Sequence, residues 1–336
     1  MVKAIVYREY GPPQDVLELA EIETPAAGDG DVLVRVQAAS VNPGDWDLLN
    51  GQPYILRPAV GIRAPRNGIL GLAIAGRVEA VGRNVTEFLP GDVVYAGIRR
   101  GGFAEYVAAP ETTAAPMPAS LTFEQAAAVP VAAVTALQGL RDVGRVQPGQ
   151  KVLINGASGG VGTFGVQIAK VFSAEVTGVC SARNEDLVRS IGADHVIDYT
   201  KEDFTTDGQK YDFIFDNVGN RSLSDCRRAL APDGVLIPNS NKGPGRWIGG
   251  YLRRAAGALA TSPFVSQKLR PFAATETRED LVALTRLIEA GKVTPIIERT
   301  YALNRTAEAL GHYGRGHARG KLVISIGQDA NQERED

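Results

Sequence analysis

The run Val152-Leu153-Ile154-Asn155 leads directly into Gly156-Ala157-Ser158-Gly159-Gly160-Val161-Gly162, and residues 163–170 then continue with helical periodicity. Glycines at this spacing allow a tight turn and a close approach of the backbone to a phosphate, and the start of the following helix offers free N–H groups to the same anion. The order strand, glycine loop and helix therefore predicts a dinucleotide-binding unit. A tight turn without a ligand and a methyltransferase-type nucleotide site are the alternatives.

Short apolar runs alternate with helical segments from Lys151 onward. Because these runs are continuously apolar rather than alternating, they indicate a parallel sheet covered by helices on both faces. The fold class that this pattern predicts is α/β, with a doubly wound parallel sheet. The expected strands are residues 152–154, 175–179, 195–197, 213–215 and 235–237.

The rest of the chain has a different texture. Before Pro118, short β-prone runs lie between Gly and Pro turns, and Thr122-Phe123-Glu124-Gln125 then has the pattern of a capping box at the start of a helical stretch. After Thr294 the β texture returns, and the closing strand 321–326 is expected to rejoin the first domain. The predicted organisation is a β-rich domain over 1–121, an α/β domain over 122–294, a return to the first domain over 295–327 and a disordered tail over 328–336.

Composition restricts the possible partners. The chain has 336 residues, 44% hydrophobic and 22% charged, which suits two globular domains. A formal net charge of −2 gives no broad field for nucleic acid or anionic lipid, so any anion site must be built locally. Cys180 and Cys226 are too few for a disulfide framework, and no signal peptide or membrane-spanning run is found. We therefore expect a cytoplasmic protein that acts on a small molecule, without nucleic acid or a membrane span.

The end of the second strand distinguishes the two nicotinamide cofactors. NAD-binding proteins usually place a carboxylate there for the adenosine ribose, but this chain has Cys180-Ser181-Ala182-Arg183-Asn184. The Ser181 hydroxyl and the permanently charged Arg183 suit a ribose 2′-phosphate, which indicates NADPH. The alternative is a solvated arginine at a helix start, with Ser181 or Asn184 as the N-cap.

The glycine loop 154–162, the segment 180–184 and the segment 187–199, following a β-rich domain, together resemble the medium-chain dehydrogenases/reductases. The zinc-independent quinone oxidoreductase and alkenal reductase branch is the most similar. The likeness covers nearly the whole chain, including residues 40–45, 90–94, 102–106 and 320–323.

This resemblance implies a GroES-like catalytic domain built from both chain ends around an inserted Rossmann domain. It also implies NADPH between the two domains, and usually a homodimer. By motif position Tyr199 joins the 2′-phosphate contacts, while Asn42 and Thr135 correspond to nicotinamide-side positions. The expected cofactor-binding residues are Asn42, Thr135, Gly156, Ala157, Ser158, Gly159, Gly160, Val161, Gly162, Ser181, Arg183, Tyr199, Asn217, Val218, Asn241 and Lys321.

The chain departs from its relatives in two places. Zinc alcohol dehydrogenases have a Cys near the position of Asn42 and a Gly-His-Glu near residues 71–73, and both are missing, so we expect no metal. Many quinone oxidoreductases have an acidic residue within 71–76, which is wholly apolar here. Without zinc, the Asn42 side-chain N–H and the Tyr54 hydroxyl are the candidate catalytic groups that stabilise negative charge on the substrate oxygen.

Two functions follow from these residues. Quinones and α,β-unsaturated carbonyls delocalise charge and depend least on a metal, which favours an NADPH-dependent reductase of such substrates. The alternative is an NADPH-binding structural or regulatory protein with little turnover. The stretch 246–254 mixes aromatic residues with arginines and could lie on a membrane, on nucleic acid, or over the substrate cleft. A cleft cover or dimer contact is favoured over a helix packed on its aromatic face with its arginines outward.

Overall fold

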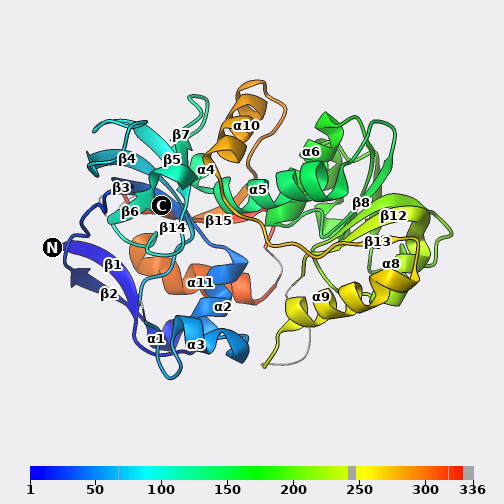
Figure 1. Ribbon diagram of the computed structural model, residues 1–336, viewed down its shortest axis with the longest axis horizontal. Coiled ribbons are helices and arrows are strands. Elements are labelled where there is room, and N and C mark those ends of the chain that lie inside the picture. Colours follow the sequence, from blue (N-terminus) through cyan, green and yellow to red (C-terminus); the bar gives the residue numbers. More distant parts are fainter. Residues whose placement is uncertain (67, 241–246, 317, 328–336) are drawn as a thin grey trace.

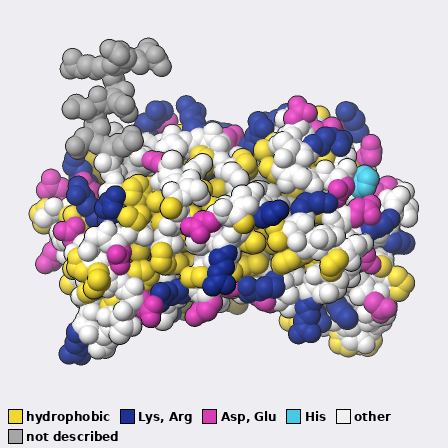
Figure 2. Space-filling view, turned by 90° about the horizontal axis from the view of Figure 1, so that it is seen from above, with side chains coloured by type: hydrophobic (Ala, Val, Ile, Leu, Met, Phe, Trp, Pro, Cys, Tyr) yellow, Lys and Arg dark blue, Asp and Glu magenta, His cyan; other side chains and the backbone are white. Residues whose placement is uncertain are grey.

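Two β-sheets organise the chain into two lobes with a narrowing between them (Figures 1 and 2). The computed structural model describes residues 1–66, 68–240, 247–316 and 318–327. Asn241 and the tail 328–336 lie outside the described residues. No helix among the described residues is long and apolar enough to cross a membrane.

The first sheet is the parallel Rossmann sheet, with the strand order β10-β9-β8-β11-β12-β13. From β8 the chain adds β9 and β10 on one side, and β11, β12 and β13 are added on the other side of β8. The glycine loop follows β8 at this switch point, where ligands bind in such folds. The predicted α/β class with a doubly wound sheet is thereby confirmed. The strands are β8 (Lys151–Asn155), β9 (Glu175–Cys180), β10 (His195–Asp198), β11 (Tyr211–Asp216), β12 (Leu230–Pro238) and β13 (Lys268–Leu269).

The second sheet combines both ends of the chain in the order β14-β15-β3-β4-β5-β7, with β6 paired to β3. Its closing strand β15 pairs antiparallel with β3, with Val323 opposite Ser40, as the apolar texture of 321–326 predicted. The limits 1–121, 122–294 and 295–327 themselves stay predictions. The strands are β3 (Asp31–Ser40), β4 (Ala73–Val81), β5 (Val93–Gly97), β6 (Tyr106–Pro110), β7 (Ala114–Pro116), β14 (Ile297–Ala302) and β15 (Lys321–Ser325), beside the hairpin β1 (Val2–Tyr7) and β2 (Leu17–Ile22).

Helices surround both sheets (Figure 1). The capping box expected at Thr122 is present, because its Oγ1 accepts from Gln125 N at 3.3 Å and its own N–H donates to Gln125 Oε1 at 3.0 Å. The helices are α1 (Pro13–Val16), α2 (Pro43–Asn50), α3 (Arg57–Val60), α4 (Phe123–Ala127), α5 (Pro130–Gln138), α6 (Gly160–Val171), α7 (Glu185–Ser190), α8 (Leu223–Ala229), α9 (Gly250–Thr261), α10 (Arg278–Glu289) and α11 (Thr306–Gly314).

One apolar core runs across the boundary between the domains. Ala75 and Tyr95 of the GroES-like sheet belong to the same buried cluster as Ile154 and Phe215 of the Rossmann sheet. The fully buried Tyr95 also donates its hydroxyl to the Leu281 carbonyl on α10 at 2.6 Å. A shared core and a buried hydrogen bond fix the two sheets relative to each other more firmly than a polar domain interface would.

Candidate functional site

The glycine loop joins β8 to α6 in a turn that leaves no room for a side chain at two of its positions. Gly156 has φ +81°, and a Cβ at this residue would lie 2.7 Å from Val218 Cγ2. A Cβ at Gly162 would come within 2.0 Å of the Gly156 carbonyl oxygen. Glycine is required at both positions, one for close packing against the turn after β11 and the other for the contact between helix and loop.

The amino end of α6 is open to a ligand. Its N-cap residue, Gly159, supplies no side-chain cap, and the first intrahelical bond runs from Thr163 N to Gly159 O. The N–H groups of residues 160–162 precede that bond, and this is the arrangement in which helix starts bind phosphates. By contrast, serine and threonine side chains cap α4 and α8. The loop and the helix start therefore fit the pyrophosphate of a dinucleotide.

The residues predicted for the adenosine end of the site lie beyond β9 and β10. Ser181 follows β9 directly, and Tyr199 follows β10 with its N–H donating to Cys180 O at 3.1 Å, so the two strand ends lie together. The Arg183 side chain is exposed, and Tyr199 is 42% exposed. The structure thus places all three predicted 2′-phosphate contacts at one edge of the sheet.

Asn184 joins this edge to the glycine loop, which the sequence did not reveal. Its buried Nδ2 donates to Ser158 Oγ at 3.0 Å and lies 3.4 Å from Ser181 Oγ. The carboxylate that ends β10, Asp198, accepts from Thr200 Oγ1 at 2.8 Å and pairs with Lys201 at 3.4 Å. The hydrogen bonds from Thr200 lower the pKa of Asp198. The Asp198 carboxylate therefore interacts with Thr200 and Lys201.

Lys321 joins two distant parts of the chain at Asn42, the predicted nicotinamide-side position. Lys321 at the start of β15 donates from Nζ to Val41 O at 2.7 Å and to Asn42 Oδ1 at 2.5 Å. Asn42 Nδ2 donates to Ser40 O at 2.9 Å, which fixes the orientation of the amide. The aliphatic part of Lys321 passes Gly160, where a Cβ would lie 3.0 Å from Lys321 Cδ. Lys321 therefore connects the glycine loop to Asn42.

Asp45 completes this buried polar group. Its carboxylate accepts from Asn42 N at 2.8 Å and from Gly71 N at 2.7 Å. Burial raises the pKa of Asp45 to about 7, against the lowering effect of those two backbone hydrogen bonds. Burial likewise lowers the pKa of Lys321 to about 7, although the charge of Asp45 opposes the shift. Both groups are thus close to changing their charge near neutral pH.

Thr135 on α5 is nearly buried and its hydroxyl donates to Val131 O at 2.7 Å. With its proton used in that bond, Oγ1 can still accept, which suits the N–H of a carboxamide. Tyr54, the other catalytic candidate, lies further out. Its ring meets the edge of Trp247 at 5.6 Å between centroids, with the Arg57 guanidinium 4.2 Å above it.

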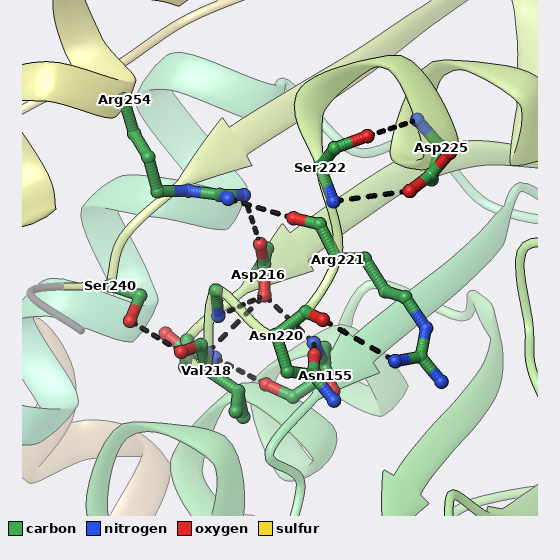
Figure 3. Close-up of polar contacts among 11 residues, drawn as sticks. Asn155, Asp216, Val218, Asn220, Arg221, Ser222, Asp225, Ser240 and Arg254 are labelled. Carbon is green, nitrogen blue, oxygen red and sulfur yellow. Dashed lines mark hydrogen bonds and ion pairs between the residues drawn. The ribbon is translucent and has the colours of Figure 1, made fainter. Parts of the chain in front are cut away.

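A buried carboxylate organises the turn after β11 (Figure 3). Asp216 Oδ1 accepts from Asn155 Nδ2 at 2.8 Å, from Gly219 N at 2.9 Å and from Val218 N at 3.3 Å. Its Oδ2 pairs with Arg254 Nη2 of α9 at 2.5 Å. This network holds the turn that contains Asn217 and Val218 against the glycine loop.

Comparison with known proteins agrees with this geometry. The family model of the alcohol dehydrogenase GroES-like domain matches residues 28–119, and that of the zinc-binding dehydrogenases matches residues 191–324. A chloroplastic quinone oxidoreductase, QR1, of Triphysaria versicolor is 32% identical over 96% of this chain and 98% of its own length. The chain belongs to the medium-chain dehydrogenase/reductase superfamily, in its quinone oxidoreductase-like branch.

Two further relatives support the assignment. Human mitochondrial NAD(P)H oxidoreductase RTN4IP1 is 33% identical, with 88% of this chain and 82% of that protein covered. The structure of the quinone oxidoreductase from Coxiella burnetii superposes with a TM-score of 0.83 at 28% identity, covering 97% of this chain and 99% of that one. The chain is accordingly a medium-chain oxidoreductase whose family uses a nicotinamide cofactor.

One of the two family models describes zinc-binding dehydrogenases, which raises the question whether this medium-chain oxidoreductase has side chains that could bind zinc. Among the described residues, no three His, Cys, Asp or Glu side chains lie close enough together to hold a metal ion. Asn42 stands where the zinc enzymes have cysteine, and its amide is already bonded to Lys321 and Ser40. The described site therefore has no set of donors that suits zinc.

The sequence missed four polar residues of the site: Asp45, Asn155, Asp216 and Arg254. Asp216 has one sequence signal, since it ends a buried strand at the ligand-binding edge. Arg254 has none, because Arg253 and Arg254 are adjacent and alike in sequence. The alternative interpretation that residues 246–254 pack with their arginines outward is wrong for Arg254, which turns inward to neutralise Asp216.

Proposed function

We propose that the chain is a zinc-independent, NADPH-dependent oxidoreductase that transfers a hydride to a quinone or an α,β-unsaturated carbonyl compound. One observation carries the choice of cofactor. Strand β9 is followed by Ser181 and Arg183 instead of a carboxylate, and Tyr199, which follows the neighbouring strand β10, bonds through its N–H to Cys180 O. A carboxylate there would repel a 2′-phosphate, whereas a hydroxyl and a guanidinium can bind it. We further propose a cytoplasmic homodimer.

Each part of NADPH has candidate contacts among the described residues. The helix start at residues 160–162 would hold the pyrophosphate, and Ser181, Arg183 and Tyr199 would hold the 2′-phosphate. Thr135 would accept a hydrogen bond from the carboxamide. When bound, NADPH supplies the hydride from C4 of its nicotinamide ring.

The protein's own contribution is to stabilise charge on the substrate oxygen. Asn42 is held by Lys321 and Ser40, and the remaining N–H of its Nδ2 has only a long contact of 3.5 Å to Ser40 Oγ. That N–H would be the preorganised donor, with the Tyr54 hydroxyl as the second group nearer the surface. Two neutral donors suit an acceptor that delocalises its charge better than a simple ketone or alcohol.

A turnover panel tests this proposal. Oxidation of NADPH and of NADH would be followed with quinones, enals and simple ketones, using purified protein. We expect turnover with NADPH on quinones or enals and little on simple ketones. Tight NADPH binding without turnover on any acceptor would instead favour the NADPH-binding structural or regulatory function, and turnover only with NADH would reject the cofactor assignment.

A further inference from the structure

Helix α9 shows an unusual distribution of side chains. A surface helix normally turns its apolar residues inward and its charges to solvent. In α9 the cation Arg254 faces inward, with only 10% of its side chain exposed. The outward side consists of Leu252, Ala256, Leu259 and Ala260, which are exposed, with Arg253 beside them.

This orientation is held by hydrogen bonds on the inner side. Arg254 donates to Asp216 and, through Nη1, to Arg221 O at 2.8 Å (Figure 3). Tyr251 donates its hydroxyl to Phe272 O at 2.7 Å. Rolling the helix would leave the fully buried Asp216 without its cation, which costs several kcal/mol. The apolar outer side is therefore a fixed feature of the fold.

A second exposed apolar segment adjoins this helix. Ile55 N donates to Trp247 O at 3.0 Å, and the rings of Tyr54 and Trp247 are in contact. Helices α3 and α9 both lie along the lower edge of the molecule in Figure 1. We call this surface the α3–α9 face. Its exposed large apolar side chains are Ile55, Leu56, Ile62, Trp247, Ile248, Leu252, Leu259 and Phe264.

The two segments that form the α3–α9 face contain no acidic residues. The sequence has no Asp or Glu between Asp47 and Glu79, and none between Asp233 and Glu276. The cations Arg63, Arg66 and Arg253 are exposed within these segments. On the opposite side of the molecule, Asp and Glu are interspersed with Lys and Arg (Figure 2). Although the net charge of the whole chain is only −2, these two segments carry positive charge without negative charge.

We propose that the α3–α9 face docks on the surface of an anionic lipid membrane. Exposed Trp, Leu and Ile next to Arg are the composition that lies at a bilayer interface, with apolar groups among the acyl chains and cations at the phosphates. A second copy of the chain fits less well, because a twofold contact through this face would bring its cations together. The inference does not depend on the proposed reaction.

Cosedimentation with vesicles tests the proposal on the full chain. The probe is vesicles of phosphatidylserine and phosphatidylcholine in equal parts, compared with vesicles of phosphatidylcholine alone. We expect binding to the anionic vesicles that weakens as salt screens the charges. Leu259→Asp and Arg253→Glu should each reduce partitioning by roughly tenfold or more, since each removes an attraction and adds a negative charge.

Leu89→Asp and Arg83→Glu are the matched controls, because Leu89 is 70% and Leu259 63% exposed, and Arg83 lies outside the face. Both controls should bind as the wild type does, and all variants should melt alike. Absence of binding to anionic vesicles, or equal losses in the face variants and the controls, would overturn the proposal. A dimer that sedimentation velocity shows to dissociate on Leu259→Asp, without vesicle binding by the wild type, would assign the face to a second copy.

Discussion

The two ends of the proposed cofactor site are built in different ways. At the adenosine end, Ser181 and Arg183 are neighbours in the chain, stand at a strand end and are accessible to solvent. At the nicotinamide end, Asn42 and Lys321 are 279 residues apart and fully buried, and they are bonded to each other. The first end can be formed by one local segment, whereas the second exists only after the two ends of the chain have come together in the GroES-like domain.

This difference separates binding from chemistry. An exposed arginine and hydroxyl can gain or lose a phosphate contact without disturbing the core. The buried groups form two clusters, one around Asn42 and one around Asp216, and within each cluster a change in one group leaves another without a partner. We therefore expect substitutions at the adenosine end to alter cofactor choice, and substitutions at the nicotinamide end to alter stability and turnover together.

The largest effect is expected for Asp216→Ala. The substitution leaves Arg254 buried without its counter-ion and removes the acceptor of Asn155, Val218 and Gly219, so unfolding free energy should fall by about 3–5 kcal/mol. Urea denaturation measures this. Asp212→Ala, on the same strand, removes a carboxylate that accepts from Lys151 N at 2.8 Å; it is the control and should cost less than about 1.5 kcal/mol.

The folded fraction of Asp216→Ala also shows whether the two ends of the proposed cofactor site can be affected separately. We expect Asp216→Ala to lose turnover while binding of 2′,5′-ADP, which occupies only the adenosine end, stays within about threefold of wild type. A loss of less than about 1 kcal/mol in stability would contradict the role of the Asp216–Arg254 pair.

The second prediction concerns pH and Lys321. Because its pKa falls to about 7 in the folded protein, the unfolded chain binds more protons above pH 7, and the stability due to Lys321 rises with pH. Asp45 does not contribute in this window, since its raised pKa of about 7 affects stability only below pH 7. Between pH 7 and 9, wild type should gain about 2 kcal/mol relative to Lys321→Met.

Urea denaturation of both proteins at several pH values gives this difference. Lys292→Met replaces an exposed lysine and controls for the loss of one positive charge. If the difference in unfolding free energy between wild type and Lys321→Met stays constant from pH 7 to 9, the buried amine keeps its proton. The prediction that Lys321 makes stability depend on pH would then be wrong.

Much of the fold could be predicted from the sequence, because its signals are local. Continuous apolar strands, the glycine loop and the Thr122 capping box each lie within a few residues, and the structure confirms each. The return of β15 to the first sheet was predictable from texture alone, since an apolar edge strand requires cover.

The buried polar groups could not be predicted, because they depend on distant pairings. The direction of Arg254 is decided by Asp216, 38 residues away, and not by its own helix. Asn42 was expected to act through its side-chain N–H, but the sequence did not show that Lys321 and Ser40 would bind both ends of the amide. The periodicity of the apolar residues indicates which face of a helix or strand is buried, and only the tertiary fold decides which polar groups meet.

Arg183→Ala tests the adenosine end. A charge-assisted contact between arginine and phosphate should make NADPH bind roughly ten- to a hundredfold more tightly, so the substitution should weaken NADPH and 2′,5′-ADP by that factor and leave NADH nearly unchanged. Calorimetric titration measures all three ligands. Arg189→Ala on α7 is the matched control, and an unchanged NADPH/NADH preference in Arg183→Ala would show that Arg183 is a surface residue at the helix start.

The smallest effect is expected for Tyr199→Phe, which removes one hydroxyl from a 42% exposed side chain and leaves the ring in place. A neutral hydrogen bond to phosphate contributes less than one from arginine, so NADPH binding should weaken by roughly three- to tenfold and NADH binding should not change. If both hydroxyl and guanidinium reach the same phosphate, the double variant Arg183→Ala/Tyr199→Phe should lose less than the product of the single effects, because the contacts share one partner. Equal weakening of NADPH and NADH in Tyr199→Phe would instead place the ring against the adenosine, where the 2′-phosphate plays no part.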